Sequence, residues 1–189
     1  PHGHCPSDMS WFGAPAVGDG ASGAAAVGLG AGAVYQYYHT PWNEVRRALP
    51  AVAEAGYDAI QLPPAQRSKR TWDDPEPRGY QPIDHLDFDS VFGTEAEYRS
   101  LVDAAHEQGL AVIADAVMNH MAEGVDFSAF PHVGWDDFRH EGPIRDDEDD
   151  WELENRDLEG LPDLKQESAH VRAYLEAYVD RYADCGVDG

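Results

Sequence analysis

Three polar side chains that can take part in chemistry lie close together in the sequence. Asp115, Asn119 and His120 bring a carboxylate, an amide and an imidazole to the end of an unbroken apolar run at residues 110–114. Such a run is typical of a strand buried on both faces of a parallel sheet, and reactive groups in parallel α/β folds lie at the carboxyl ends of strands. A carboxylate that leaves a buried strand needs partners or a task. The spacing therefore favours a functional site, with a structural polar cluster as the alternative.

The elements that would hold these residues alternate between strand and helix. Apolar runs and apolar periodicity predict strand 33–38, helix 42–52, strand 58–62, helix 94–109, strand 110–114, helix 168–182 and the first residues of a strand at 186–189. Thr94 and Glu97 predict a capping box for the middle helix, and Ser168 is expected to cap the last one. The alternation predicts right-handed crossovers and a parallel sheet, which a doubly wound sheet and a piece of a (β/α)8 barrel both satisfy.

Two longer stretches show no clear period. Residues 65–92 are predicted to form a polar loop, and its Gly-Tyr-Gln-Pro at 79–82 is a second place to look for a site because it follows a strand. The stretch from 118 to 166 includes an acidic run at 146–150, for which a solvated face is the expected role. No GxGxxG follows the first strand, so a dinucleotide-binding function has no support.

Composition limits the classes of function. The 189 residues suit one domain or a fragment of a larger one, and 42% hydrophobic residues are enough for a core. The formal charge of -23, from 36 acidic and 13 basic residues, argues against a nucleic-acid partner. Only Lys69 and Lys165 among the basic residues are lysines, and such an acid-rich, Lys-poor composition resembles that of halophilic proteins. No apolar run reaches the ~18–20 residues of a membrane span, so no membrane partner is expected.

The first 32 residues are rich in Gly, Ala, Pro and His and are predicted to form a flexible leader. The tract GAAAVGLGAGA at 23–33 is either a linker or the remnant of a secretory signal. The HGHC at 2–5 has no matching ligand cluster, and no metal site is expected there. Cys5 and Cys185 are expected to be free thiols, with a disulfide as the alternative.

The hexapeptide DAVMNH at 115–120 resembles the D-x-V-x-N-H strand motif of the alpha-amylases, glycoside hydrolase family 13. Residues 79–82 resemble the loop after the family's second barrel strand, and the GLPDL at 160–164 resembles a motif near the end of the family's domain B. The opening at 34–39 is similar to the first barrel strand of haloarchaeal amylases. The resemblance covers about residues 33–189. It implies an α/β fold, namely a partial (β/α)8 TIM barrel of about three and a half βα units with a domain-B-like insertion after the third strand.

The resemblance also implies a structural calcium ion. Asn119 would donate its side-chain oxygen to the ion, and Asp163 would supply a carboxylate. A backbone carbonyl near Glu154 is a third expected ligand, by its spacing to Asp163. Hard oxygen ligands of this kind suit Ca²⁺, which would clamp the insertion onto the barrel.

The family further implies substrate contacts. His120 would hydrogen-bond the sugar at the cleavage subsite, and Tyr80 would stack on the apolar face of that sugar. Asp115 would support the site from beneath, and Gln81 is a candidate sugar contact. Trp72, Trp135 and Trp151 are further candidate sugar platforms, although burial in the loops is the expectation for each. His85, His106, His132 and His140 receive no role.

By this resemblance the chain has four parts: the leader at 1–32, three barrel strands and two helices at 33–120, the domain-B-like insertion at 121–166, and a barrel helix with the start of a fourth strand at 167–189. Family members cleave α-1,4-glucosidic bonds in starch and related α-glucans with retention. The nucleophile is expected just beyond Gly189 and the general acid later still, so the chain is expected to be an inactive, truncated part of a secreted enzyme that is monomeric when complete. The alternative is a non-catalytic carbohydrate-binding or interaction remnant of the same fold.

Overall fold

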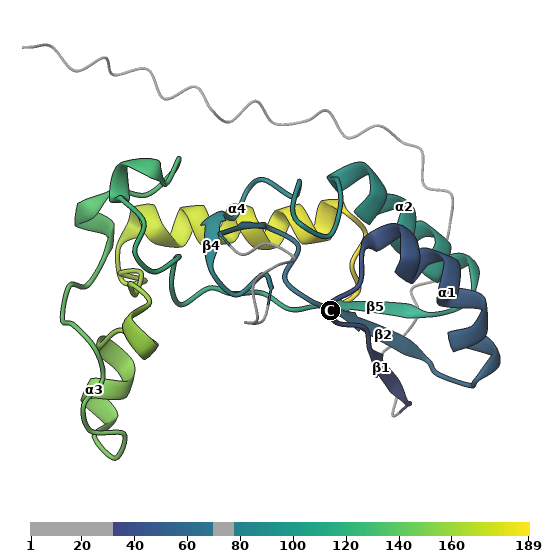
Figure 1. Ribbon diagram of the computed structural model, residues 1–189, viewed down its shortest axis with the longest axis horizontal. Coiled ribbons are helices and arrows are strands. Elements are labelled where there is room, and N and C mark those ends of the chain that lie inside the picture. The colour runs from purple at the N-terminus through teal and green to yellow at the C-terminus, as the bar shows by residue number, and fades with distance from the viewer. Residues whose placement is uncertain (1–31, 70–77) are drawn as a thin grey trace, which may run out of the picture.

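Three parallel strands form the sheet on which the chain is built. In the computed structural model, which describes residues 32–69 and 78–189, β1 (Val34–Gln36), β2 (Ala59–Leu62) and β5 (Ala111–Ala114) pair in the order β1-β2-β5 (Figure 1). Residues 188–189 lie alongside β5: the Asp188 N–H donates to Val112 O (2.9 Å) and the Ala114 N–H donates to Gly189 O (2.7 Å). The predicted parallel sheet is confirmed, and the end of the chain bonds as a strand does.

The order of these segments in space follows their order in the chain. In the common doubly wound sheets the first strand lies between later ones. Among the described residues β1 is instead an edge, and residues 188–189 bond the side of β5 that faces away from β2. Each connection thus advances by one neighbour in the same direction, as it does around a barrel.

One hydrophobic core joins three helices to the sheet, and Figure 1 shows them on the same side of the strands. These are α1 (Trp42–Glu54), α2 (Glu95–Glu107) and α4 (Ala169–Asp184). The apolar positions that predicted the helices are the buried ones: Trp42, Val45, Leu49 and Val52 in α1; Tyr98, Leu101, Val102 and Ala105 in α2; Val171, Tyr174, Leu175, Tyr178 and Tyr182 in α4. Within the ranges that the structure describes, no helix has both the length and the apolar character needed to cross a bilayer.

Of the two helix caps predicted from the sequence, one forms and the other does not. The Glu97 N–H donates to Thr94 Oγ1 (3.3 Å) and the Thr94 N–H donates to Glu97 Oε2 (2.8 Å), so the predicted capping box is confirmed. Ser168 occupies the N-cap position of α4, but its side chain makes no capping hydrogen bond. The expectation of a Ser168 side-chain cap is therefore wrong, although the helix does begin there.

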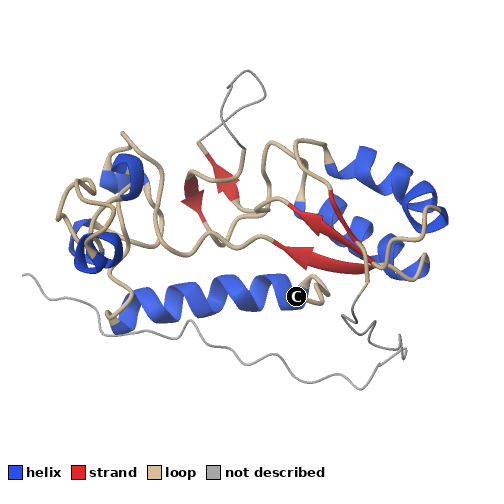
Figure 2. Cartoon of the chain, turned by 90° about the horizontal axis from the view of Figure 1, so that it is seen from below, coloured by secondary structure: helices blue, strands red, loops and turns tan. Residues whose placement is uncertain are grey.

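The long loop after β2 contains a hairpin that the sequence did not indicate. Within residues 65–92, β3 (Arg67–Ser68) pairs antiparallel with β4 (Pro82–Asp84) (Figure 2). Strands of two and three residues are too short to show an alternating pattern, which is why the predicted polar loop did not include this hairpin. Arg67 fixes the hairpin through ion pairs with Asp84 (3.4 Å) and Asp87 (2.7 Å).

Residues 121–166 form short helices and turns around a second core. They contain α3 (Asp150–Asn155) and the 3₁₀ turns η1 (Phe127–Ala129), η2 (Trp135–Asp137) and η3 (Leu158–Gly160). The second core packs this segment against the first half of α4, which runs from there to the sheet (Figure 2). The acidic run at 146–150 is exposed, as predicted, and the Asp149 carboxylate caps α3.

The burial expected for the loop tryptophans is wrong at both positions that the structure describes. Trp135 is 61% exposed and Trp151 is 51% exposed. Short turns with one small core bring too little surface together to cover two large indoles as well. Trp72, Cys5 and the leader up to residue 31, with its HGHC motif, lie outside the described residues. Cys185 is buried with a free thiol.

Candidate functional site

Tyr80 and Asp115, which come from different motifs, are joined by a hydrogen bond. Tyr80 Oη donates to Asp115 Oδ2 over 2.6 Å. Burial of the phenol, reinforced by this acceptor, raises the pKa of Tyr80 well above its usual range, so the hydroxyl stays protonated. The Asp115 N–H donates to Leu62 O at the end of β2 (3.2 Å). The pair therefore lies at the carboxyl ends of β2 and β5, the edge of the sheet where the sequence placed its candidates.

His120 joins this pair from the loop after β5. Its Nε2–H donates to the Tyr80 carbonyl (3.0 Å), which leaves Nδ1 as an acceptor. Burial lowers the pKa of His120, so the ring is neutral. Within the described residues, neither His120 Nδ1 nor the buried Gln81 Oε1 has a hydrogen-bond donor. Buried acceptors without donors are rare in folded proteins and need an explanation, which the hydroxyls of a ligand can provide.

Gly79 allows the loop to bring Tyr80 to this position. Its φ is +93°, a conformation that side chains disfavour, and an added Cβ would lie 2.9 Å from Pro64 O. Any other residue would push the loop away from the end of β2. The glycine of the Gly-Tyr-Gln-Pro segment is thus required by close backbone approach.

A buried hydrogen-bond network, which the sequence did not indicate, supports the site from α4. Tyr178 Oη donates to Gln66 Oε1 (2.6 Å), and Gln66 Nε2 donates to Gly79 O (2.6 Å). Tyr182 Oη donates to Asp115 O (3.1 Å). Both tyrosines belong to the apolar stripe that predicted α4, and a stripe pattern does not reveal that their hydroxyls are used. The network fixes both the loop that carries Tyr80 and the backbone of Asp115.

His85, to which the sequence gave no role, links α4 to the loop after β5. Its Nε2–H donates to Val117 O (2.7 Å), and its Nδ1 accepts from the Tyr174 hydroxyl (3.0 Å). Burial lowers the pKa of His85 to about 4. The neutral ring therefore has both nitrogens bonded, and it positions the backbone just before Asn119 and His120.

Asn119 and Asp163 are brought together by a short antiparallel contact. Residues His120 and Asp163 form a β-bridge, the Leu164 N–H donates to Asn119 O (2.8 Å), and Asn119 Nδ2 donates to Asp163 Oδ1 (2.8 Å). Asp163 is only 2% exposed. Burial, and then the nearby Asp157, raise the pKa of Asp163 to about 6. A carboxyl group is thus held in a poorly solvated place beside a second acid.

The third expected ligand is not joined to this pair. Glu154 is exposed on α3, and no hydrogen bond or ion pair in the described part of the chain links it to Asn119 or Asp163. The acid that lies beside Asp163 is Asp157. The backbone N–H of Asp163 donates a hydrogen bond to Asp157 Oδ1 (3.2 Å). Within residues 32–69 and 78–189, no group of three or more His, Cys, Asp or Glu side chains is arranged to hold a metal ion.

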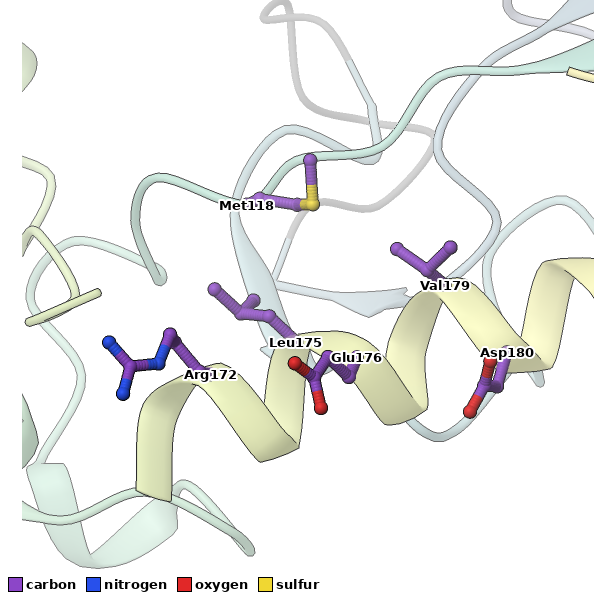
Figure 3. A pocket seen from close by; sticks show the side chains of 6 residues that line it. All are labelled: Met118, Arg172, Leu175, Glu176, Val179 and Asp180. Carbon is purple, nitrogen blue, oxygen red and sulfur yellow. The ribbon is translucent and has the colours of Figure 1, made fainter. Parts of the chain in front are cut away.

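A groove of about 340 Å³ lies apart from these residues, between Met118 and the exposed side of α4 (Figure 3). Its lining consists of Met118, Arg172, Leu175, Glu176, Val179 and Asp180. None of the site residues predicted from the sequence contributes to it. The candidate site is therefore defined by the convergence of Tyr80, Asp115 and His120 and not by this groove.

The chain is similar to alpha-amylases by family, by sequence and by structure. Residues 41–189 match the alpha-amylase catalytic domain. An alpha-amylase from Aeromonas hydrophila is 31% identical over 174 residues, a match that covers 84% of this chain and 38% of the relative. The structure of a mutant of alpha-amylase I from Eisenia fetida with maltohexaose superposes with a TM-score of 0.76 at 25% identity, covering 84% of this chain and 36% of that one. The structure of an alpha-amylase from Geobacillus thermoleovorans, complexed with acarbose, superposes with a TM-score of 0.73 at 28% identity. This match covers 84% of this chain and 39% of that one.

These structural neighbours are TIM barrels, and the described residues form a partial α/β unit of the same architecture. The chain spans well under half the length of each of these relatives. The family match nevertheless extends over most of the chain, and it includes every residue of the candidate site. The chain therefore belongs to the alpha-amylase catalytic-domain family of glycoside hydrolases.

Proposed function

We propose that this chain supplies the first βα units of a retaining glycosidase that cleaves α-1,4-glucosidic bonds in starch or related α-glucans. Its family supports this, and so do the maltohexaose and acarbose bound by the two solved relatives. The observation that carries the proposal is the convergence of Tyr80, Asp115 and His120 at the carboxyl ends of the strands. In barrels of this kind the substrate binds at that face.

Each residue has a proposed part in holding the sugar. Tyr80 presents the face of its ring to the apolar face of a glucose unit, and its bond to Asp115 fixes the ring. His120 Nδ1 and Gln81 Oε1 are buried without a donor among the described residues, and a local opening of the loop would let them accept hydrogen bonds from sugar hydroxyl groups. Because Asp115 is already engaged by Tyr80, its part is support. We place the nucleophile and the general acid outside these 189 residues.

Replacement of Tyr80 tests the proposal. Tyr80→Ala is expected to weaken maltohexaose binding about tenfold, because the stacking surface is lost, and His120→Ala is expected to weaken it to a similar degree. The measurement is an NMR titration of the chain in molar KCl with calcium, which detects millimolar affinities. Tyr80→Phe is the matched control: it keeps the ring and should retain most of the affinity. Unchanged binding by Tyr80→Ala would contradict the proposed site.

We further propose that Asn119 and Asp163 hold a structural calcium ion, with Asp157 or the backbone near Glu154 completing the oxygen ligands. The residues fit such an ion, because the Asp163 carboxyl group lies buried beside Asp157 and a cation would stabilise the ionised forms of both. Ligation by Asn119 requires its amide to turn so that Oδ1 replaces Nδ2 beside Asp163. When bound, the ion would clamp residues 121–166 to the end of β5.

Removal of calcium is expected to destabilise the complete enzyme that carries this chain. A chelator should lower the melting temperature by about 5 °C or more, and Asp163→Asn should remove this calcium dependence, because loss of a bound ligand costs native-state stability. Glu154→Gln is the control and should behave as the wild type, since only a backbone carbonyl is expected to bind there. If neither the chelator nor the Asp163→Asn substitution changes the melting temperature, the calcium site is excluded. On the chain alone we expect weak calcium binding or none.

The family and the substrate also lead us to propose a secreted enzyme that is monomeric when complete. Starch is a polymer that does not cross membranes, so an enzyme that degrades external starch has to act outside the cell. The surplus of acidic residues supports a haloarchaeal-type protein adapted to concentrated salt.

A further inference from the structure

The carboxylate of Asp188 connects residues 188–189 to both β5 and α2. Its Oδ2 accepts the backbone N–H of Val112 in β5 (2.8 Å) and the Nε2–H of His106 in the last turn of α2 (2.9 Å). We propose that Asp188 and His106 are positioning residues, which set the register of residues 188–189 against β5 and so the place of the residues that follow on this strand. Their importance for catalysis rests on the proposed function above, whereas their effect on the register does not.

The N–H groups of β5 alternate between its two neighbours, as they do in a parallel ladder. The Ala111 N–H donates to Asp58 O on the side of β2 (2.9 Å). The Ala114 N–H donates to Gly189 O on the other side (2.7 Å). The Val112 N–H faces this second side as well, so it needs an acceptor from the residues that precede Gly189.

A backbone carbonyl would ordinarily accept this bond, and here a side chain does so. By the two-residue period of the ladder, the carbonyl of Val187 is the expected acceptor. The Val187 N–H still bonds back to Tyr182 O (3.2 Å), however, so residue 187 belongs to the turn that ends α4. The Asp188 carboxylate takes the place of the carbonyl. Because its side chain is short, it reaches the Val112 N–H only while residue 188 lies beside Val112, and the bond therefore permits one register.

His106 holds the same carboxylate from the side of α2. The side chains of Asp188 and His106 are only 16% and 25% exposed. A carboxylate that has lost much of its water needs hydrogen-bond donors, and His106 supplies the second one. The turn at Gly186, where φ is +84°, lies beside the imidazole, since an added Cβ would be 4.0 Å from His106 Cε1. Helix α2, strand β5 and the turn after α4 therefore meet at this carboxylate.

The register set here matters at the opposite end of the strand. The candidate site lies at the carboxyl end of β5, where Asp115 bonds Tyr80. The proposed function expects the nucleophile just beyond Gly189, on the continuation of residues 188–189. A strand advances about 3.3 Å per residue, and a slip by one residue turns every side chain to the other face. Since a misplacement of ~1 Å can cost ~10²-fold in rate, the register of this strand decides whether a nucleophile on it can react.

Amide hydrogen exchange, followed by NMR on the full 189-residue chain in 2 M KCl, tests the register. Asp188→Ala removes the acceptor of the Val112 N–H, so this amide is expected to exchange at least about tenfold faster, while the Ala111 amide on the side of β2 keeps its rate. Asp188→Asn retains a side-chain oxygen and should restore most of the Val112 protection. His106→Ala leaves the carboxylate less firmly held and should speed the exchange of Val112 about threefold.

Arg99→Ala is the matched control. Arg99 also joins α2 to the end of α4, but its guanidinium bonds Glu95 and the Asp184 carbonyl and not β5. It should lower the melting temperature without a selective effect on Val112. Unchanged Val112 protection in Asp188→Ala overturns the inference, and so does an equal rise at Ala111 and Val112, which would show only a general loss of stability. If Asp188→Ala does not fold, unchanged Val112 protection in His106→Ala overturns it.

Kinetics of the complete enzyme that carries this chain test the link to catalysis. Asp188→Ala is expected to lower kcat at least about tenfold and to leave KM within about twofold, because Tyr80 and His120 hold the sugar from other loops. Asp188→Asn should recover most of kcat. An unchanged kcat in Asp188→Ala overturns the positioning role. If the wild-type enzyme does not act on starch, the proposed function fails, and the exchange rates still decide whether the pair sets the register.

Discussion

Incubated with soluble starch and calcium in molar salt, this chain is expected to release no reducing ends above a blank. A retaining glycosidase needs a nucleophile and an acid/base whose carboxyl groups are ~5–5.5 Å apart. Asp115 is bonded to Tyr80, and Asp163 is buried against Asn119. Neither carboxylate is therefore free to act as the nucleophile or the acid/base, and we place that pair outside these 189 residues. Without that pair, glycosidase rate enhancements of ~10⁶-fold and above are not available.

The His120→Ala variant provides the control for this assay. Turnover by the wild-type chain that disappears in His120→Ala would show that the catalytic apparatus lies within these residues, contrary to expectation. Turnover that is equal in both preparations would come from a contaminating amylase. Sugar binding measured on the same samples shows that an inactive chain is folded.

Transfer from 2 M KCl to dilute buffer is expected to unfold much of this chain. Acidic residues exceed basic ones by 23, and at low ionic strength their mutual repulsion opposes the compact state. The exposed ion pairs, such as Arg67 with Asp87, offset little of this, because exposed pairs contribute at most ~1 kcal/mol each. The melting temperature should fall by at least about 10 °C, which for a domain of this size corresponds to roughly 3 kcal/mol.

Sucrose at equal osmolarity separates charge screening from a general salting-out effect. Sucrose favours burial because it is excluded from protein surfaces, but it does not screen charges. If repulsion is the cause, KCl should restore the fold and sucrose should restore it only in part. Cooperative unfolding in dilute buffer at the melting temperature found in 2 M KCl would count against a halophilic protein.

Much of the sheet and its helices could be predicted because local sequence determines them. The apolar stripe of α2 is the buried face of that helix, and the Thr94 capping box forms as the sequence indicates. The run at 110–114 contains β5. Tyr80, Asp115 and His120 could be named because strand ends are where functional groups collect in parallel folds.

The supporting residues could not be predicted because they depend on contacts between distant segments. Gln66 lies 112 residues from Tyr178, and His85 lies 89 residues from Tyr174. A stripe of apolar residues on a helix indicates that a tyrosine is buried, but it does not indicate which group its hydroxyl bonds. The exposure of Trp135 likewise depends on how residues 121–166 fold, and a segment without periodicity does not reveal this.

The order β1-β2-β5 followed by residues 188–189 has a consequence for how the chain acquires its structure during synthesis. Within this sheet, each strand pairs with the sheet strand that precedes it in the chain, so its partner has already left the ribosome when it emerges. The sheet can therefore grow from its amino-terminal edge without waiting for later segments. The pairing of Asn119 with Leu164 must instead wait until the intervening residues have been translated. The strand-end loop is thus expected to become ordered later than the strands β1, β2 and β5 that precede it.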